Sequence, residues 1–376
     1  MLKQKPTLSR RSFTQLLGTG TALAALRPVA SLAAPARRLL STPTAAPVRL
    51  SSNENPYGPA PAALQAMTDA FGLAWRYPDE HADALVEALA KLHGVTAERI
   101  LLGNGSGEIL KVAAAALTGV GRRLVLADPT FEAIARHAAA NRAEVSRIPL
   151  TADYRHDLAK MRAAALDAGL IYICNPNNPT ASLTPKTELR AFITQMPRQT
   201  TVLVDEAYHH YAESGDYESV IPLVESHPNL IVARTFSKIY GMAGLRCGYC
   251  VAQPEMIERL RTQQTWDSAN IMALVAARAS LQDAAHVAEG RRLNSTIKQQ
   301  VCAELEQMKF TYIPSNANFL MIDLRRDVRP LIKAMGARRV EVGRFFPALP
   351  THMRVTIGTR ADMQAFLTAF RQIVAS

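Results

Sequence analysis

The sequence predicts an α/β fold, in which a mostly parallel sheet lies between helices and a smaller α+β domain completes the chain. Short runs of β-branched and aliphatic residues alternate with alanine-rich stretches, and strands that are separated by helices pair in parallel. From about Glu255 the chain becomes mainly helical before the smaller unit begins. The runs expected to be strands of the large sheet are Ile100–Leu102, Leu124–Ala127, Val145–Ile148, Leu170–Cys174, Thr201–Val204 and Leu230–Ala233.

Helical segments are expected before and between these strands. From Ala82 the sequence ADALVEALAKLHG repeats apolar residues at helical spacing, and Gly94 ends the pattern. Glu108–Leu117 and Phe131–Ala140 are alanine-rich stretches that lie between consecutive predicted strands. The smaller unit is expected to contain strands near Phe319–Ile322 and Met353–Ile357 and a closing helix from Asp362.

The chain of 376 residues is long enough for two domains, and its 48% of apolar residues can form a large core. We expect residues 1–33 to be a signal peptide and residues 34–75 to form an arm and part of the small domain. Residues 76–270 are expected to form the large domain, and residues 271–376 the C-terminal small domain.

Much of the net charge of +11 belongs to the first 33 residues, which contain five bases and no acid. Without this leader, 38 bases face 32 acids, which leaves +6. The remaining bases are scattered, whereas a nucleic-acid-binding face needs clustered cations, so no nucleic-acid partner is expected. The bases of the leader are Lys3, Lys5, Arg10, Arg11 and Arg27.

The leader resembles a twin-arginine export signal. Arg10 and Arg11 stand in SRRSF, a weakly apolar run follows from Leu16 to Leu26, and SLAAPA offers small residues for cleavage after Ala33. The apolar run is too short to span a membrane. The resemblance implies the twin-arginine translocation machinery as a partner and a periplasmic or other extracytoplasmic location. The alternative is a disordered basic tail.

The four cysteines do not form a metal-binding pattern. Cys247 and Cys250 have C-x-x-C spacing, but neither a second pair nor a histidine cluster accompanies them. Zinc is therefore not expected, and no metal site is predicted. Although an exported protein can form disulfides, buried free thiols are the preferred interpretation for these two residues and for Cys174 and Cys302.

Polar residues follow several predicted strands, where ligands bind in open α/β sheets. After the first strand, GNGSGE places Gly105, Ser106 and Gly107 where a helix begins. Backbone N–H groups and the helix dipole favour an anion such as phosphate there, although glycine–serine turns before helices are common. After the second strand, Phe131 is suited either to stacking on a flat ring or to packing in the core.

Amides follow the fourth strand, in NPNNPT. Prolines fix the backbone around Asn175, Asn177 and Asn178, and amides held in this way are good donors to a fixed oxygen. After the fifth strand, Asp205 is expected to be a buried carboxylate that needs a cationic partner. Tyr208 follows three residues later.

The sixth strand leads into RTFSKIYGMAGLRCGY, where Lys238 has no carboxylate nearby in the sequence and Arg246 is the next cation. A lysine amine that attacks a carbonyl must be neutral, which requires desolvation or neighbouring cations. A single ligand, pyridoxal phosphate, could interact with all of these side chains. It combines a phosphate, an aromatic ring, a basic ring nitrogen, a ring oxygen and an aldehyde.

The motifs PNNPT, DEAY and RTFSK with GLRCG, in this order, resemble the fold-type-I aminotransferases of class I and II, and most of all the histidinol-phosphate aminotransferase branch. The resemblance extends from about Leu50 to the C-terminus. It implies pyridoxal 5'-phosphate as cofactor, an amino donor and a 2-oxo acid acceptor as substrates, and a homodimer with shared active sites.

The resemblance also implies roles for individual residues. Lys238 would bind the cofactor's aldehyde covalently and act as acid and base, and Asp205 would pair with the ring nitrogen. Arg354, in MRVTIGT, would bind the anionic end of the substrate, with Asn55 and Tyr57 as further substrate contacts. The other implied cofactor contacts are Asn178 and Tyr208 at the ring oxygen, Phe131 on the ring, Gly105, Ser106, Gly107, Thr235, Ser237 and Arg246 at the phosphate, and Tyr77 at the phosphate of the neighbouring subunit.

The sequence departs from the family pattern at two places. Ala181 stands where the family usually has glycine after PNNPT. The stretch ARRLLSTPTAAPVRL, which precedes SSNENPYGP, lacks the motif of a proline–tyrosine pair with a glycine and a basic residue that many family members have there.

We therefore expect a transaminase that moves an amino group between an amino acid or amine with an anionic group and a 2-oxo acid. A decarboxylase of phosphothreonine type is the alternative on the same scaffold, because the sequence does not reveal which bond breaks. A non-catalytic binding module for the cofactor would not need Arg354. A structural exported protein would not explain Lys238 together with Asp205.

Overall fold

The structure is a computed structural model that describes residues 46–375. The predicted signal peptide, its cleavage point and residues 34–45 of the predicted arm lie outside the described residues. The chain from Pro47 onward forms one continuous unit. The predicted domain boundaries within it, near residues 76 and 271, stay predictions.

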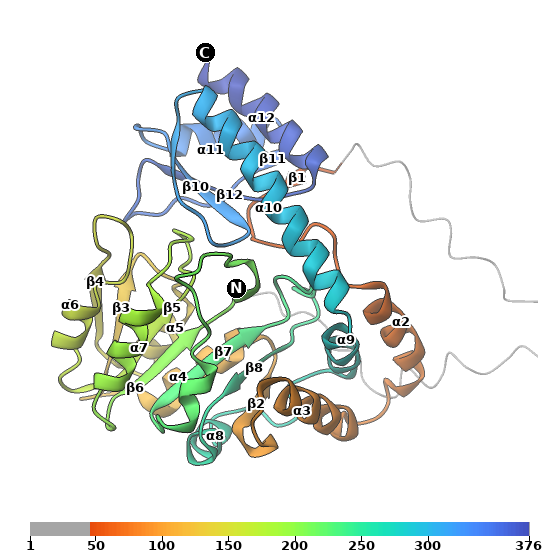
Figure 1. Cartoon of the computed structure of the whole chain (residues 1–376), viewed down its shortest axis with the longest axis vertical. Helices are drawn as coiled ribbons and strands as arrows, with labels where there is room; N and C mark the ends of the chain where they lie inside the picture. Colours follow the sequence, from red (N-terminus) through yellow and green to blue (C-terminus); the bar gives the residue numbers. More distant parts are fainter. Residues whose placement is uncertain (1–45, 376) are drawn as a thin grey trace, which may run out of the picture. The chain divides into compact units, whose positions relative to one another are not determined.

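A seven-stranded sheet, a three-stranded sheet, a separate two-stranded pair and the surrounding helices make up this unit (Figure 1). The strands are β1 (Val48–Arg49), β2 (Ile100–Gly103), β3 (Arg123–Asp128), β4 (Val145–Pro149), β5 (Ala168–Cys174), β6 (Thr201–Asp205), β7 (Leu230–Thr235), β8 (Gly248–Val251), β9 (Thr311–Ile313), β10 (Phe319–Asp323), β11 (Val340–Glu341) and β12 (His352–Thr356). The α-helices are α2 (Pro61–Ala70), α3 (Asp79–His93), α4 (Ser106–Leu117), α5 (Ala133–Ala140), α6 (Leu158–Ala163), α7 (Lys186–Gln195), α8 (Pro254–Arg261), α9 (Ile271–Leu281), α10 (Ala284–Gln307), α11 (Arg329–Ala337) and α12 (Arg360–Val374). Short 3₁₀ segments occupy Phe71–Leu73, Ala97–Arg99, His209–Tyr211 and Ile221–Glu225.

The large sheet has seven strands in the order β2-β8-β7-β6-β5-β3-β4. Parallel pairs connect β4, β3, β5, β6 and β7, whereas β8 runs antiparallel to both of its neighbours. The predicted α/β fold and all six predicted strands are therefore confirmed. Strand β8 was not among them, because it follows β7 without an intervening helix and so breaks the alternation from which the others were predicted.

The core of the large sheet lies on both of its faces. In β5, Leu170 and Tyr172 face one apolar cluster while Ile171 and Ile173 face the other, and all four are fully buried. Helices α4, α5 and α8 cover the first face, and α3, α7 and α9 contribute to the second. Burial on both faces is the usual state of a parallel sheet and explains the continuous apolar runs in the sequence.

The small sheet has three antiparallel strands in the order β12-β10-β9, and it includes the two strands predicted for this region. Residue Arg354 of β12 lies opposite Met321 of β10. A separate parallel pair joins Val48 of β1 to Val340 of β11, so the start of the described chain meets its C-terminal part. In Figure 1 the long helix α10 lies beside α12, which covers the small sheet.

The ends of the helices follow local signals. Gly94 takes a left-handed conformation, with φ of 64°, and ends α3 where the sequence predicted. Helix α5 begins at Ala133 rather than at Phe131, so Phe131 and Glu132 lie in the preceding loop. At α12, Thr359 and Asp362 form a capping box that satisfies the first backbone N–H groups.

The cysteines are free thiols, and three of them are buried as predicted. Cys302 is only partly buried, so the prediction was wrong for its burial. Cys247 and Cys250 belong to the apolar clusters on opposite faces of the large sheet, because residues three apart on an extended chain point in opposite directions. Burial raises the pKa of both thiols to about 12.

Within residues 46–375, no three His, Cys, Asp or Glu side chains are grouped closely enough to hold a metal ion. None of the helices described is both long and apolar enough to cross a membrane.

Candidate active site

A pocket of about 330 Å³ lies at the carboxyl ends of the parallel strands, where the sequence predicted it. The segments after β5, β6 and β7 meet there because these strands are parallel neighbours in the sheet. The start of α4, the loop before α5 and the strand β12 complete the wall.

Lys238 lies on the loop after β7 and lines this pocket. Its Nζ donates to the backbone carbonyl of Asn53 at 3.1 Å and to that of Ser52 at 3.4 Å. Burial, followed by the charge of Arg354, lowers the pKa of Lys238 to about 8, and Arg246 contributes in the same direction. Both conditions that a nucleophilic lysine needs, desolvation and neighbouring cations, are therefore present.

Asp205 ends β6 as a fully buried carboxylate at the pocket wall. Its Oδ2 accepts a hydrogen bond from the Tyr172 hydroxyl at 2.9 Å, and its Oδ1 accepts one from the Ala207 N–H at 3.1 Å. Burial raises its pKa to about 6, although both hydrogen bonds and Lys238 act against the rise. Among the described residues, no cationic side chain forms an ion pair with Asp205, so the cationic partner expected from the sequence is not supplied by the described chain.

Glu206, which follows Asp205 in the sequence, does have a cationic partner. Glu206 pairs with Arg234 of β7 at 2.8 Å, and both side chains are buried. The Ser219 hydroxyl and the Val220 N–H also donate to the Glu206 carboxylate, both at 2.8 Å. This network ties the end of β6 to β7 and fixes the loops from which Asp205 and Lys238 reach the pocket. Both partners stand in the DEAY and RTFSK motifs, but sequence reasoning did not single them out.

The start of α4 forms one end of the pocket. Gly105 has φ of 74°, a conformation that favours glycine, and a Cβ there would lie 2.2 Å from Nη2 of Arg246 and would displace that guanidinium. Ser106 and Gly107 line the pocket at the first helical positions of α4, where backbone N–H groups are free of intrahelical partners. On the facing loop, Arg246 Nη1 donates to the Ser237 hydroxyl at 3.3 Å.

Thr235 completes this end of the pocket, since its hydroxyl donates to the Ser237 hydroxyl at 2.9 Å and accepts from the Ser237 N–H at 3.1 Å. Hydroxyl groups, a guanidinium and a helix N-terminus thus converge at one end. This donor set is suited to a phosphate group.

Tyr208 and Asn178 lie together on the wall. The Tyr208 hydroxyl oxygen accepts from Nδ2 of Asn53 at 3.1 Å and from Nδ2 of Asn178 at 3.2 Å, which leaves its own proton to donate. Asn178 also accepts from Arg354 Nη1 through Oδ1 at 2.8 Å. Asn178 therefore connects the tyrosine to the arginine predicted to hold the substrate. Asn53, which has φ of 54°, was missed by sequence reasoning.

The other two amides of NPNNPT turn away from the pocket, which corrects the prediction that this loop supplies several ligand donors. Asn177 donates to the Pro129 carbonyl at 3.0 Å and to the Thr180 hydroxyl at 2.8 Å, and it accepts from the Thr130 hydroxyl at 2.7 Å. Its hydrogen-bonding capacity is used in holding the loop, so its role is structural.

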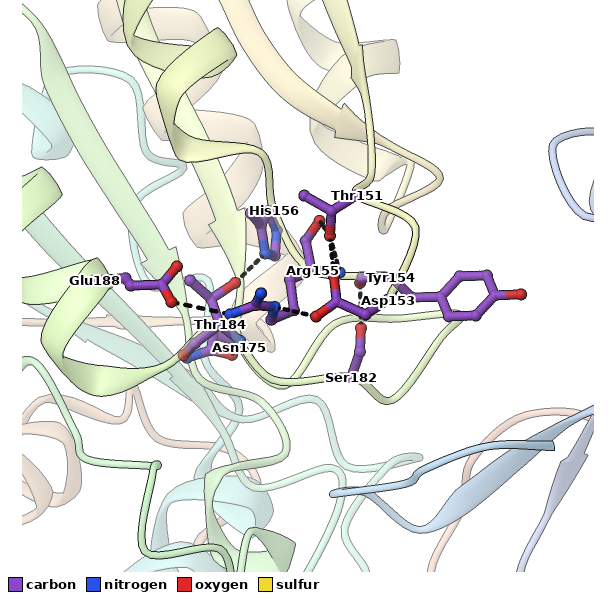
Figure 2. A network of polar contacts seen from close by, with 9 residues as sticks. All are labelled: Thr151, Asp153, Tyr154, Arg155, His156, Asn175, Ser182, Thr184 and Glu188. Carbon is purple, nitrogen blue, oxygen red and sulfur yellow. Dashed lines mark hydrogen bonds and ion pairs between the residues drawn. The ribbon is translucent and has the colours of Figure 1, made fainter.

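Asn175 belongs to a second bracing network, which Figure 2 shows from close by. It exchanges two hydrogen bonds with the backbone of Thr184, at 3.1 and 2.9 Å. The Thr184 hydroxyl in turn lies 2.7 Å from Nδ1 of buried His156, and burial lowers the pKa of that histidine to about 4. The Ser182 hydroxyl donates to the Tyr154 carbonyl at 2.6 Å. The network braces the loop of Asn178, because Asn175 and Ser182 stand before and after Asn178 in the sequence.

Of four further predicted residues, one lines the active-site pocket and three lie away from its wall. Phe131 lines the pocket with 39% of its surface exposed, so the alternative that it is a core residue is wrong. Asn55 donates to the Ile239 carbonyl at 2.7 Å and lies on a separate pocket of about 250 Å³. Tyr57 is 39% exposed and, like Asn55, is not on the wall of the active-site pocket. Tyr77 is 79% exposed and also lies away from this wall.

Sequence reasoning missed the loop between β11 and β12, which supplies Arg344 and Phe346 to the pocket wall. The Phe346 ring centroid lies 4.3 Å from Cζ of Arg344 and 5.3 Å from Cζ of Arg354. The signal in the sequence was GRFF, an arginine followed by two aromatic residues shortly before the Arg354 strand. The two arginines meet on one aromatic ring.

The pocket fits pyridoxal phosphate on the observations above. Asp205, a buried carboxylate that pairs with no cation of residues 46–375, is available to a protonated ring nitrogen, and the Tyr208 hydroxyl has a proton for the ring oxygen. The donor set around Ser106 and Arg246 is suited to the phosphate, and Lys238 offers an amine of lowered pKa to the aldehyde.

Comparison with known proteins agrees with this fit. The family described as aminotransferase class I and II matches residues 46–370. Histidinol-phosphate aminotransferase from Moorella thermoacetica is 40% identical over 87% of this chain and 86% of its own length, and that from Symbiobacterium thermophilum is 39% identical over 86% and 90%. The structure of the Sinorhizobium meliloti histidinol-phosphate aminotransferase in complex with pyridoxal-5'-phosphate superposes with a TM-score of 0.83 and 28% identity, covering 88% of this chain and 91% of that one.

The chain thus belongs to the class I and II aminotransferases, with the fold-type-I architecture of pyridoxal-phosphate enzymes. It is a pyridoxal-phosphate-dependent transaminase, and its similarity lies with proteins of the histidinol-phosphate aminotransferase type. The family, the fold and the cofactor predicted from the sequence are confirmed.

Proposed function

We propose that the amino donor carries a phosphate monoester, as histidinol phosphate does, and that a 2-oxo acid is the acceptor. The proposal rests on the excess of positive charge in the pocket. The cationic side chains that line it are Lys238, Arg246, Arg344 and Arg354, and Asp205 is a carboxylate on the same wall. Lys238 is needed for the bond to the cofactor and Arg246 for the cofactor's phosphate. Arg344 and Arg354 remain for an anion of the substrate.

The position of these two arginines favours a phosphate over a single carboxylate. Both guanidinium groups lie against Phe346, so their charges converge on one region of the wall. A phosphate dianion has enough oxygens and charge to accept from two guanidinium groups at once. The names of the related proteins support the same substrate.

Different residues of the pocket would hold the cofactor and transfer the proton. Bound pyridoxal phosphate supplies the electron sink that makes the donor's α-proton acidic. Asp205 would hold the ring nitrogen by charge, while Tyr208 and Asn178 would hold the ring oxygen. The Nζ amine of Lys238, oriented by the carbonyls of Ser52 and Asn53, would take the proton from the donor's α-carbon. Proton transfer by a positioned group typically contributes about 10²–10⁴-fold to the rate.

A screen of amino donors with the holoenzyme and 2-oxoglutarate tests the substrate. Histidinol phosphate, histidinol, histidine and phosphothreonine are compared, and glutamate formation is measured. We expect histidinol phosphate to give the highest kcat/KM, and Arg344→Gln to raise its KM more than that of histidinol. Equal activity with histidinol and with histidinol phosphate would overturn the proposal.

The decarboxylase alternative predicts a different product from the same pocket. With phosphothreonine, a decarboxylase releases carbon dioxide and leaves an amine, whereas a transaminase releases a 2-oxo acid and forms glutamate. The family and the related proteins favour transamination. Trapping carbon dioxide from phosphothreonine, without glutamate, would reverse this preference.

We propose that Lys238 carries the cofactor covalently. Its lowered pKa and its place at the pocket wall support this role. Borohydride reduction of the holoenzyme followed by peptide mapping should place the pyridoxyl group on Lys238, and a label on another lysine would refute the assignment.

We propose a homodimer in which Tyr77 contacts the cofactor phosphate of the second copy. Phe71, Trp75 and Tyr77 form an aromatic segment between α2 and α3, and they are 63%, 75% and 79% exposed. Exposed aromatic residues in such density mark an interaction surface. Sedimentation should give a dimer, and mixing inactive Lys238→Ala with Tyr77→Ala should restore part of the activity through mixed dimers. A monomer, or no restoration, would contradict shared sites.

We propose export by the twin-arginine route, which carries folded proteins and would deliver the enzyme with its cofactor. The support is the order of paired arginines, apolar run and small residues in the leader, which lies outside the described residues. Cells that express Arg10→Lys with Arg11→Lys should keep an active, cofactor-loaded enzyme in the cytoplasm. Full recovery of this variant in the periplasmic fraction would refute the proposed export route. The assignment of the chain as an aminotransferase would not be affected.

A further inference from the structure

Glu132 lies at the edge of the active-site pocket and is paired with one of the substrate-facing arginines. Its Oε2 lies 3.0 Å from Nη2 of Arg344. Glu132 follows Phe131 in the loop before α5, whereas Arg344 lies in the loop between β11 and β12, so the pair connects the two sides of the pocket. The reaction itself gives Glu132 no role.

The surroundings of Arg344 show what this pair does. Its Nη1 donates to the Phe345 carbonyl at 3.0 Å, and its guanidinium rests on the Phe346 ring. Nη2 is the group that Glu132 occupies. One donor group of an arginine that lines the pocket is therefore held by an internal carboxylate.

The pair is weak enough to be exchanged. The side chains of Arg344 and Glu132 are 52% and 35% exposed, and exposed ion pairs of this kind contribute little to stability. A phosphate dianion binds a guanidinium through stronger, charge-assisted hydrogen bonds, and Arg354, whose Cζ lies 5.3 Å from the Phe346 ring centroid, adds a second cation. A singly charged carboxylate gains less from the same exchange.

We propose that Glu132 is a specificity-determining residue, an internal anion that competes with the substrate's anionic group for Arg344. This inference rests on the proposed function, since it requires a substrate anion at Arg344. A donor without that anion leaves the Glu132–Arg344 pair closed, and a donor with a phosphate replaces it. Glu132 therefore sets how strongly an anion must bind before it enters this end of the pocket.

The test measures kinetics of Glu132→Gln holoenzyme at fixed ionic strength, because surface electrostatics depend on salt. We expect KM for histidinol phosphate to fall about two- to fivefold, the range of an exposed ion pair, with kcat unchanged. The inhibition constant of inorganic phosphate, used as a competitor, should fall by a similar factor. KM for histidinol, which has no phosphate, should stay the same.

Two control variants separate this effect from a general change of charge. Arg136 lies 3.6 Å from the same oxygen of Glu132 but is 79% exposed, so Arg136→Gln removes a neighbour without freeing Arg344. Glu304 pairs with Arg371 between α10 and α12, and Glu304→Gln removes an exposed ion pair elsewhere. Neither variant should lower KM for histidinol phosphate.

The outcomes distinguish the two proposals. If Arg344→Gln leaves KM for histidinol phosphate unchanged, Arg344 does not bind the substrate's phosphate, and this part of the proposed function is refuted. If Arg344→Gln raises KM but Glu132→Gln changes neither KM nor phosphate inhibition, only the role of Glu132 is refuted. A fall in KM for histidinol equal to that for histidinol phosphate would also refute it.

Discussion

The floor of the active-site pocket and its outer wall are built in different ways. The floor comes from the ends of β6 and β7, where Asp205, Glu206 and Arg234 are buried and Glu206 makes hydrogen bonds to several partners. The outer wall comes from the loop after β11, where Arg344 is 52% exposed and is held by one carboxylate, one ring and the carbonyl of the adjacent Phe345.

This difference matches what each side has to do. Proton transfer and charge stabilisation need groups fixed in one geometry, and buried networks supply that fixation. Transamination uses a donor and an acceptor of different shape in the same pocket, so the contacts that recognise them have to adjust. The catalytic groups on the floor are therefore held in place by buried hydrogen bonds, whereas the substrate contacts on the wall are exposed and can change partner.

The largest expected effect comes from breaking the floor. Glu206→Gln leaves Arg234 as a buried charge without its partner, which typically costs about 3–5 kcal/mol. We expect the free energy of unfolding of the holoenzyme to fall by that order in urea titrations. The matched control is Glu304→Gln in an exposed pair, which should change it by less than about 1 kcal/mol. Similar losses in both variants would contradict the contrast between floor and wall.

A second test separates catalysis from stability at Asp205. Burial raises its folded-state pKa from 3.8 to about 6, so the apoenzyme gains stability from this group below pH 4 and loses it as the pH rises through 6. The loss amounts to about 3 kcal/mol. Asp205→Asn should abolish most turnover, while its apoenzyme loses less stability than the wild type between pH 4 and pH 7.

Urea unfolding of the two apoenzymes across this pH range measures the difference. Turnover near the wild-type rate in Asp205→Asn would refute the role of Asp205 at the ring nitrogen. Parallel pH profiles of stability would show instead that this carboxyl is not the group that titrates.

A third test links the wall to the floor through Lys238. Arg354 is the strongest of the charges that lower the pKa of Lys238 to about 8, so Arg354→Gln should raise that pKa by about one unit or less. The rate at which apoenzyme takes up pyridoxal phosphate, measured by absorbance against pH, should shift to higher pH by the same amount. An unshifted profile would mean that Arg354 does not contribute to the lowered pKa of Lys238.

The smallest effect is expected at Ala181, where the family usually has glycine. Ala181 is fully buried with φ of 60°, a conformation that costs an L-residue about 1–2 kcal/mol. Ala181→Gly relieves this strain but loses about 0.8 kcal/mol of methyl burial and adds unfolded-chain entropy. We expect the free energy of unfolding to change by less than about 1 kcal/mol and kcat to stay the same. A larger change would show that the Asn178 loop is less rigid than its network indicates.

The floor could be predicted from the sequence far better than the wall. Lys238, Asp205, Tyr208 and Asn178 each follow a strand that local pattern identifies, and parallel strands bring their carboxyl ends to one edge. The roles of Asn175 and Asn177 could not be predicted, because a local pattern does not show which way an amide faces. Two of their partners, Thr184 and Thr130, lie outside the motif that suggested a ligand.

The sequence by itself determined the α/β architecture, the family and the cofactor, because periodicity and motifs are local properties of the chain. Only the tertiary structure revealed that Glu206 pairs with Arg234, that Asn53 reaches Tyr208 across 155 positions, and that Glu132 meets Arg344. These contacts join residues far apart along the chain. Their distances depend on how the helices and both sheets pack, and no local pattern encodes that packing.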